Sequence, residues 1–365
     1  MQKRSFGLAC LFLSAIVGAG FATGREIMTY FARYGLPGFA GLGISSLLLA
    51  AAGSRLYVLA YRMETDSPLL VSRRLAGQRM GKLLAICIAL FSYCIYVIML
   101  AGTSDLAGSN LPAFQKFWPR FLLTAMISLL SFLVLLRGFE SLAALCAVFA
   151  PVIAISLAVS AVLSSFCCTE TAEVFHLFSA GAEQGGISGT QSLSDTLLVY
   201  GQMLFSAVLY AGYNTLVAAS ILPRAGTVIP NRRTAVLGGI FGGLLFFACG
   251  AAVYAALYHS WPDIHYAAMP LLMLAGRLGT FGKAAFPAVL GLTMILSAVA
   301  GLSGCCVSFT ADRKRQKRLG VLLAAAAVPL SFIGFGSLMD ILYPIFGFAG
   351  IFLLIMLALD SGKTV

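Results

Sequence analysis

Ten long apolar runs follow one another along the 365-residue chain, and short segments between them hold most of its charge. A helix needs about 20 predominantly apolar residues to cross the hydrocarbon core of a bilayer, so each run is long enough to span a membrane. We predict spans near residues 5–34, 36–61, 82–106, 118–136, 140–165, 195–223, 234–258, 283–309, 319–337 and 339–359.

The composition supports an all-α polytopic membrane protein. Only 10% of the residues are charged and the mean hydropathy is +0.96, whereas a typical soluble domain is about 25% charged. The ten spans leave no stretch long enough for a soluble domain, so we expect one transmembrane domain over residues 1–365 in contact with the lipid bilayer.

Charge placement predicts the orientation. The net charge is +11, but the positive residues lie between apolar runs, so they indicate membrane topology rather than a nucleic-acid partner. With the N-terminus in the cytoplasm, most of the 24 Lys and Arg residues fall in cytoplasmic segments, as the positive-inside rule requires. We expect a bacterial inner-membrane protein with both termini cytoplasmic.

The first span carries a predicted break. Gly18, Gly20 and Gly24 fall within a few residues of one another at mid-membrane depth, and Arg25 and Glu26 follow directly. Each glycine weakens a helix by about 1 kcal/mol relative to alanine. Irregular backbone at this depth is tolerated only where protein or a water-filled cavity satisfies its polar groups. We therefore predict an interrupted helix that lines a site.

The glycines of the seventh span have a different interpretation. Gly238 and Gly242, and likewise Gly239 and Gly243, are spaced four residues apart. This spacing places small residues on one helix face and is typical of close contact between membrane helices. We predict tight packing here rather than a break.

A second break is predicted in the sixth span, where polar side chains interrupt the apolar run over residues 201–215. Interruptions in spans one and six of ten fit two five-helix units, near residues 5–165 and 195–359. An odd number of spans per unit gives the units opposite orientation, the inverted repeat of many secondary transporters.

Three motifs carry a resemblance to a known family. They are Val-Gly-Ala-Gly-Phe-Ala-Thr-Gly-Arg-Glu at 17–26, Tyr-Gly-Leu-Pro-Gly at 34–38 and Tyr-Val-Ile-Met-Leu-Ala-Gly at 96–102. Together they resemble the YkvI-like membrane proteins, which are classed with amino-acid permeases of the amino acid–polyamine–cation superfamily. The resemblance implies the five-plus-five fold of the bacterial leucine/sodium symporter, the LeuT fold.

That resemblance implies where a small-molecule substrate would bind. Residues 18–20 look like the first-helix break, at which backbone amides meet a carboxylate. Gly201, Gln202, Phe205 and Ser206 look like the start of the sixth helix, where an aromatic side chain covers the substrate. The expected substrate-binding residues are Gly18, Ala19, Gly20, Phe21, Tyr96, Phe205, Tyr210 and Asn214.

Residues 300–303 look like the eighth-helix segment that binds sodium in the symporter. The implied ligands are Ser14, Val17, Ala300 and Ser303. Gly304 replaces a second hydroxyl and Phe21 replaces an asparagine, so the resemblance supports one sodium site at most. No cofactor is expected besides sodium as coupling ion, and protons are the alternative.

Arg25 is the charged residue with the strongest functional signal, because a charge near membrane depth is costly and usually functional. We expect Asp340 to pair with it, with Gln202 nearby, and the three to form a gate. The alternative is that Arg25 reaches the membrane surface and Asp340 caps a helix. Glu26 could pair within its own helix or contact a neighbouring span.

The sequence predicts a transporter rather than an enzyme. Gly-Leu-Ser-Gly at 301–304 matches the motif of intramembrane serine proteases, but such a serine needs a nearby base, and every histidine lies outside the apolar runs. We expect sodium- or proton-coupled transport of an amino acid or similar zwitterion. The alternatives are a channel or a non-transporting sensor on the same fold. Nothing in the sequence sets the oligomeric state.

Overall fold

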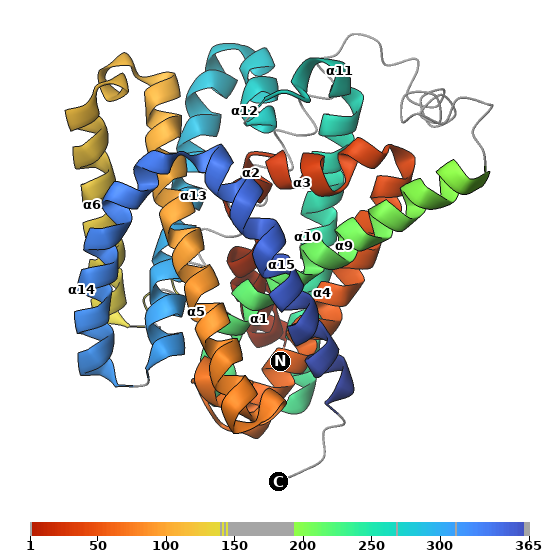
Figure 1. Cartoon of the computed structure of the whole chain (residues 1–365), viewed down its shortest axis with the longest axis vertical. Helices are drawn as coiled ribbons and strands as arrows, with labels where there is room; N and C mark the ends of the chain where they lie inside the picture. Colours follow the sequence, from red (N-terminus) through yellow and green to blue (C-terminus); the bar gives the residue numbers. More distant parts are fainter. Residues whose placement is uncertain are drawn as a thin grey trace.

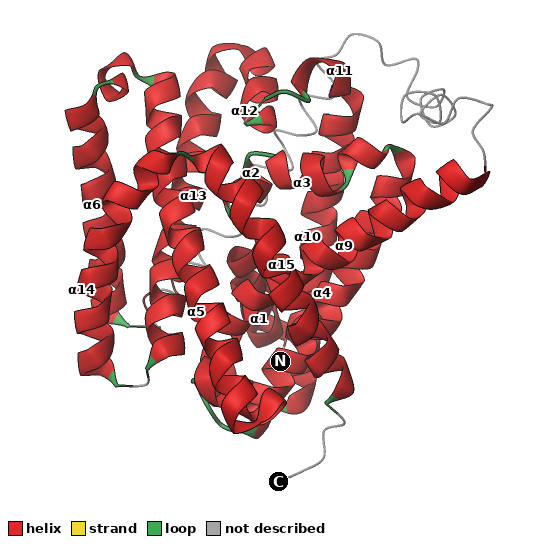
Figure 2. Ribbon diagram, in the orientation of Figure 1, coloured by secondary structure: helices red, strands yellow, loops and turns green. Residues whose placement is uncertain are grey.

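A computed structural model describes residues 2–138, 141, 144, 193–267, 269–310 and 312–360. Every regular element in these ranges is a helix (Figure 2). In chain order they are α1 (Gln2–Ile16), α2 (Ala19–Ala22), α3 (Arg25–Tyr30), η1 (Ala32–Tyr34), α4 (Leu36–Arg62), α5 (Pro68–Asn110), η2 (Pro112–Gln115), α6 (Phe117–Arg137), α9 (Leu193–Ile221), η3 (Leu222–Val228), α10 (Arg232–His259), α11 (Trp261–Ile264), α12 (Pro270–Ala275), η4 (Gly276–Leu278), α13 (Gly279–Phe309), α14 (Arg313–Leu330), η5 (Ser331–Ile333) and α15 (Phe335–Leu359).

The described residues hold eight helices long and apolar enough to cross a membrane, which makes this a multi-pass membrane protein. Each of the eight overlaps one predicted span. The first predicted span corresponds to α1, α2 and α3 together, of which only α1 contains a further apolar helix, at Arg4–Ile16. The predicted fifth span, 140–165, lies outside the described residues apart from positions 141 and 144.

The predicted break in the first span is present. Helix α1 ends at Ile16, and α2 begins at Ala19 after two non-helical residues. A second interruption separates α2 from α3, where Gly24 has a φ of 79°, a left-handed conformation that glycine adopts without steric cost. The carbonyl of Thr23 accepts the backbone N–H of Leu271 at 2.9 Å. A backbone N–H of α12 thus provides the hydrogen-bond partner of one carbonyl in the broken segment.

The predicted break in the middle of the sixth span is wrong. Helix α9 is continuous from Leu193 to Ile221 and passes into the 3-10 helix η3 only there. Two of the polar side chains that suggested a break bond to their own helix. Asn214 donates to the carbonyl of Tyr210 at 3.1 Å, and Thr215 donates to that of Ala211 at 2.7 Å. Because these groups are satisfied locally, the helix need not open.

The helices of the two predicted units pack in corresponding pairs. Helix α4 packs along α10, α5 along α13 and α6 along α14, which pairs spans two, three and four with spans seven, eight and nine. In Figure 1, α6 and α14 lie side by side at the left edge and α1 lies near the centre. This pairing is what two related units would give.

The glycines of α10 confirm the predicted tight packing. A Cβ added at Gly239 would lie 2.2 Å from the backbone nitrogen of Ser54 on α4. One added at Gly242 would lie 2.2 Å from the ring of Phe12 on α1. Because no larger residue fits, these glycines set how closely α1, α4 and α10 approach.

Candidate functional site

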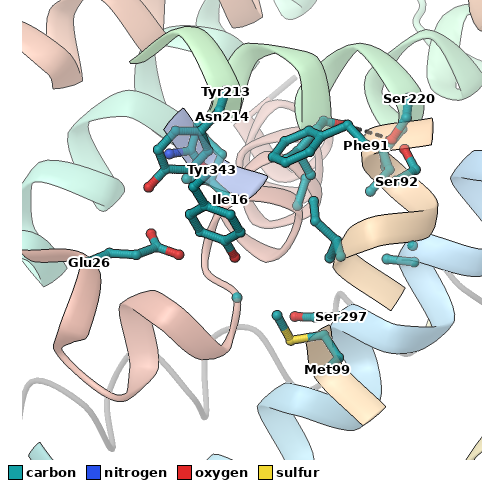
Figure 3. Close-up of a pocket in the computed structure, with 17 residues that line it drawn as sticks. Ile16, Glu26, Phe91, Ser92, Met99, Tyr213, Asn214, Ser220, Ser297 and Tyr343 are labelled. Carbon is teal, nitrogen blue, oxygen red and sulfur yellow. Dashed lines mark hydrogen bonds between the residues drawn. The ribbon is translucent and has the colours of Figure 1, made fainter. Parts of the chain in front are cut away.

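An enclosed cavity lies where the first span is interrupted. Its walls come from α1, α3, α5, α9, α13 and α15, and the room inside is about 20 Å³. That is enough for about one water molecule, so this conformation is closed around an almost filled site. Figure 3 shows the side chains that line it. They include Glu26, Phe91, Asn214, Ser297 and Tyr343, together with Gly18.

Glu26 supplies the acidic group of the cavity. Its side chain is 2% exposed, and its Oε2 accepts a hydrogen bond from the hydroxyl of Tyr210 at 3.2 Å. The carboxyl also packs against Gly20, because a Cβ added there would lie 2.1 Å from Oε1. The rings of Tyr213 and Tyr343 lie beside Glu26 in the cavity (Figure 3).

Several predicted site residues meet at this cavity. Gly18, Asn214 and Ala300 line it directly. Gly20 and Tyr210 adjoin it through Glu26. Ala19 begins α2 beside Gly18, but its side chain lies outside the described residues.

Three predicted substrate-binding residues lie elsewhere. Phe21 is fully buried against Phe246, with ring centroids 5.5 Å apart. The hydroxyl of Tyr96 donates to Ser128 on α6 at 2.8 Å. Phe205 is 51% exposed and packs near Phe348. In this conformation each of the three packs against another surface and does not line the central cavity, so its role in substrate binding stays a prediction.

Two of the predicted sodium ligands, Ser14 and Ser303, use their hydroxyl groups in hydrogen bonds, although the atoms expected to bind sodium at Ser14 and Val17 are the backbone carbonyls. The hydroxyl of Ser14 donates to the carbonyl of Leu11 at 2.9 Å, and Val17 is the buried residue directly after α1. The hydroxyl of Ser303 accepts a hydrogen bond from Nη1 of Arg224 at 2.7 Å, and both side chains are buried. A guanidinium therefore stands beside the oxygen that sodium was expected to use.

The predicted pair between Arg25 and Asp340 is present. Nη2 of Arg25 lies 3.1 and 2.9 Å from the two carboxylate oxygens of Asp340, which joins α3 to α15. Gln202 is exposed instead, and it lines a surface pocket with Thr29 and Tyr30. The structure therefore contains the predicted ion pair but does not bring Gln202 to it, and a gating role stays a prediction.

Most of the lining residues were not predicted from the sequence, among them Phe91, Tyr213, Ser297 and Tyr343. These four lie on α5, α9, α13 and α15 and are not marked by any short motif. Only the three-dimensional packing of these helices brings them together.

Two proteins of Bacillus subtilis are similar to the chain in sequence. It is 23% identical to the uncharacterized membrane protein YkvI over 357 residues, which cover 94% of this chain and 92% of YkvI. It is also 23% identical to the uncharacterized protein YyaD, over 96% of this chain and 94% of YyaD. No protein-family model matches. The resemblance predicted from the sequence motifs is confirmed as distant homology to YkvI over nearly the full length.

Among solved structures, the chain is similar to MhsT in complex with L-phenylalanine. The TM-score is 0.68 at 14% identity, and the match covers 98% of this chain and 88% of MhsT. The chain has the LeuT fold.

Proposed function

We propose that the protein is a secondary active transporter for an amino acid or a similar small zwitterion. The observation that carries the proposal is the enclosed cavity at the interrupted first span, because transporters built on discontinuous helices bind solutes at such breaks near the bilayer midplane. The likeness to a structure solved with L-phenylalanine supports this class of solute.

In this proposal the cavity binds solute through both polar and apolar side chains. Asn214 offers an amide and Tyr213 a buried hydroxyl. Phe91 and Tyr343 supply apolar ring surface around the solute. The Arg25–Asp340 pair closes one end, which the predicted topology places on the outer side. Alternating access then requires this ion pair to separate.

The first test is thermal stability of the purified protein against a panel of amino acids, followed by counterflow of stabilising solutes in proteoliposomes. A solute that binds the folded state raises the melting temperature by mass action. Exchange across the vesicle membrane supports a transporter. Stabilisation without exchange supports a sensor. Ion conductance without solute exchange supports a channel.

A cavity-filling variant makes the test specific to this site. Gly18→Leu places a side chain where the nearest atoms are 3.7 and 3.8 Å from the added Cβ, so the fold has room while the cavity does not. We expect counterflow to be abolished. The matched control is Gly7→Leu on α1, where no atom lies within 4 Å of the added Cβ. Equal counterflow in both variants would mean that this cavity is not the solute-binding site.

A further inference from the structure

Glu26 is an acidic side chain in an unusual place. Among the described residues it is the only Asp or Glu that is buried. It lies beyond the first break, at the start of α3, and reaches the central cavity. Removing a carboxylate from water is costly unless a positive charge or a proton neutralises it.

No described Lys, Arg or His side chain lines the cavity. The groups that face Glu26 are tyrosines, namely Tyr30 on its own helix, Tyr210 and Tyr213 on α9, and Tyr343 on α15. From α5 and α13 come Phe91, Ser92, Met99 and Ser297, none of which carries charge.

The cation next to Glu26 in the sequence, Arg25, already forms an ion pair. Arg25 directs its guanidinium to Asp340, at 2.9 Å, so this charge is balanced by another carboxylate. A proton on Glu26 would therefore make the closed cavity neutral.

A buried hydroxyl beside Glu26 is incompletely hydrogen-bonded. The Tyr213 hydroxyl interacts with Glu26 but makes no hydrogen bond of ordinary distance and angle with the described residues. An unpaired buried hydroxyl costs free energy, which a bound solute or water in the cavity would recover. Tyr210 meanwhile holds Oε2 of Glu26 at 3.2 Å. The cavity is therefore built to accept a polar ligand next to a carboxyl group.

The arrangement at Ser303 argues against sodium as the coupling ion. Nη1 of Arg224 lies 2.7 Å from the Ser303 hydroxyl oxygen. Like charges repel one another, and the repulsion weakens less in a buried site than in water. A sodium ion at Ser303 would meet this repulsion from a buried guanidinium and compete with it for the same oxygen.

We propose that Glu26 carries the coupling proton, an inference that rests on the proposed transport function. When the cavity opens to one side, the carboxylate takes a proton from a hydronium ion and leaves water. The closed cavity holds the neutral carboxyl group. On the other side the O–H bond breaks and the proton returns to water, so each cycle moves one proton and leaves Glu26 unchanged.

The test uses the full-length protein in proteoliposomes that contain a pH-sensitive dye, with a radiolabelled mixture of the protein amino acids as probe. A gradient of one pH unit supports accumulation of up to about tenfold per proton. We expect wild-type protein to accumulate label under a pH gradient without sodium and to move protons with it. Accumulation driven only by a sodium gradient would overturn the proposal.

The decisive variant is Glu26→Gln, which keeps size and hydrogen-bonding capacity but cannot carry a proton. We expect it to lose the gradient-driven accumulation and to show counterflow that no longer varies with pH. Glu64→Gln, at an exposed position between α4 and α5, should behave as wild type. Accumulation by Glu26→Gln at the wild-type level would contradict the proton role. Loss of all counterflow would contradict it too, because that result is expected of a residue that binds the solute itself.

Infrared spectroscopy tests the proton without any transport. The wild-type protein at neutral pH should show the C=O band of a protonated carboxyl group, and Glu26→Gln should lack it while Glu64→Gln keeps it. Absence of the band from wild-type protein contradicts the proposal even if solutes exchange. If wild-type protein neither accumulates nor exchanges any amino acid, the transport function itself fails, which is a separate result.

Discussion

Arg25 and Asp340 form an ion pair between side chains that differ in exposure, at 21% and 57%. An ion pair this accessible to water contributes about 0–1 kcal/mol to stability. In the proposed transport cycle it acts as a gate, because a weak link between α3 and α15 can break and re-form.

We expect Arg25→Ala to leave the melting temperature nearly unchanged while opening the cavity more often. A cysteine placed at Ser297, inside the cavity, should react faster with a membrane-impermeant thiol reagent in this variant than with Arg25 present. The parent protein without the added cysteine corrects for native thiols. Lys116→Ala, which removes an exposed charge elsewhere, should not alter the rate. An unchanged rate in Arg25→Ala would remove the gate assignment.

Asp105 acts on two neighbours at once. It forms an ion pair with Arg120 at the start of α6, and its Oδ2 accepts the backbone N–H of Phe335 at 3.0 Å. The residue therefore fixes the end of α5 to the beginnings of α6 and α15. Hydrogen bonds to a charged group contribute about 1.5–3 kcal/mol each.

We expect Asp105→Ala to lower the stability by about 1–3 kcal/mol, because the Phe335 amide and Arg120 both lose a partner. Thermal unfolding in detergent measures the loss. Asp66→Ala, at an exposed position after α4, is the control and should match wild type. Equal melting temperatures for both variants would contradict this account of Asp105.

At the scale of elements, α10 is the helix that holds α1 and α4 together. Its glycines pack directly against the backbone of α4 and the Phe12 ring of α1, and a Cβ at these positions would overlap those atoms. Without a hydrophobic driving force between helices in lipid, such close contact supplies much of the association. The broken first span is therefore held by its intact half, α1, against α10.

We expect Gly239→Leu to abolish correct assembly, since even the Cβ would overlap the Ser54 backbone, and overpacking alone costs about 1–3 kcal/mol. Size-exclusion chromatography and thermal unfolding report the result. Ala255→Leu adds a leucine at an exposed position of the same helix and should assemble normally. A monodisperse, stable Gly239→Leu protein would mean that α4 and α10 can separate without loss of the fold.

For the molecule as a whole, the spans that lie within the described residues were predicted well from the sequence. A helix that crosses the membrane requires a long apolar run, and such runs are visible in the sequence itself. It predicted the first break because Gly18, Gly20 and Gly24 weaken a helix whatever surrounds them. It failed in the sixth span because Asn214 and Thr215 bond to carbonyls four residues earlier, which composition does not reveal.

The candidate site was predicted only in part. Gly18 was predicted from the likeness to the symporter, Ala300 as a sodium ligand from the same likeness, and Asn214 from the cost of an unpaired amide in lipid; all three line the cavity. Tyr343 and Ser297 could not be found, because their place depends on which faces of α15 and α13 turn inward.

At this scale we expect the melting temperature in the presence of a stabilising amino acid to be the same with sodium or with potassium. The reason is that Arg224 already donates to Ser303, so sodium gains no free oxygen there. Thermal unfolding across matched chloride salts measures this. An Arg224→Ala variant gives the comparison, and a larger ligand shift in sodium for the unaltered protein would contradict the expectation.

The nearly filled cavity, with room of about 20 Å³, has a kinetic consequence. A solute cannot diffuse into this conformation, so the association rate is limited by how often the closed form opens rather than by encounter. The association rate constant then falls below the range of about 10⁵–10⁷ M⁻¹s⁻¹ that is usual for binding without a conformational change. In stopped-flow experiments the observed binding rate should level off at high solute concentration, at a plateau equal to the opening rate.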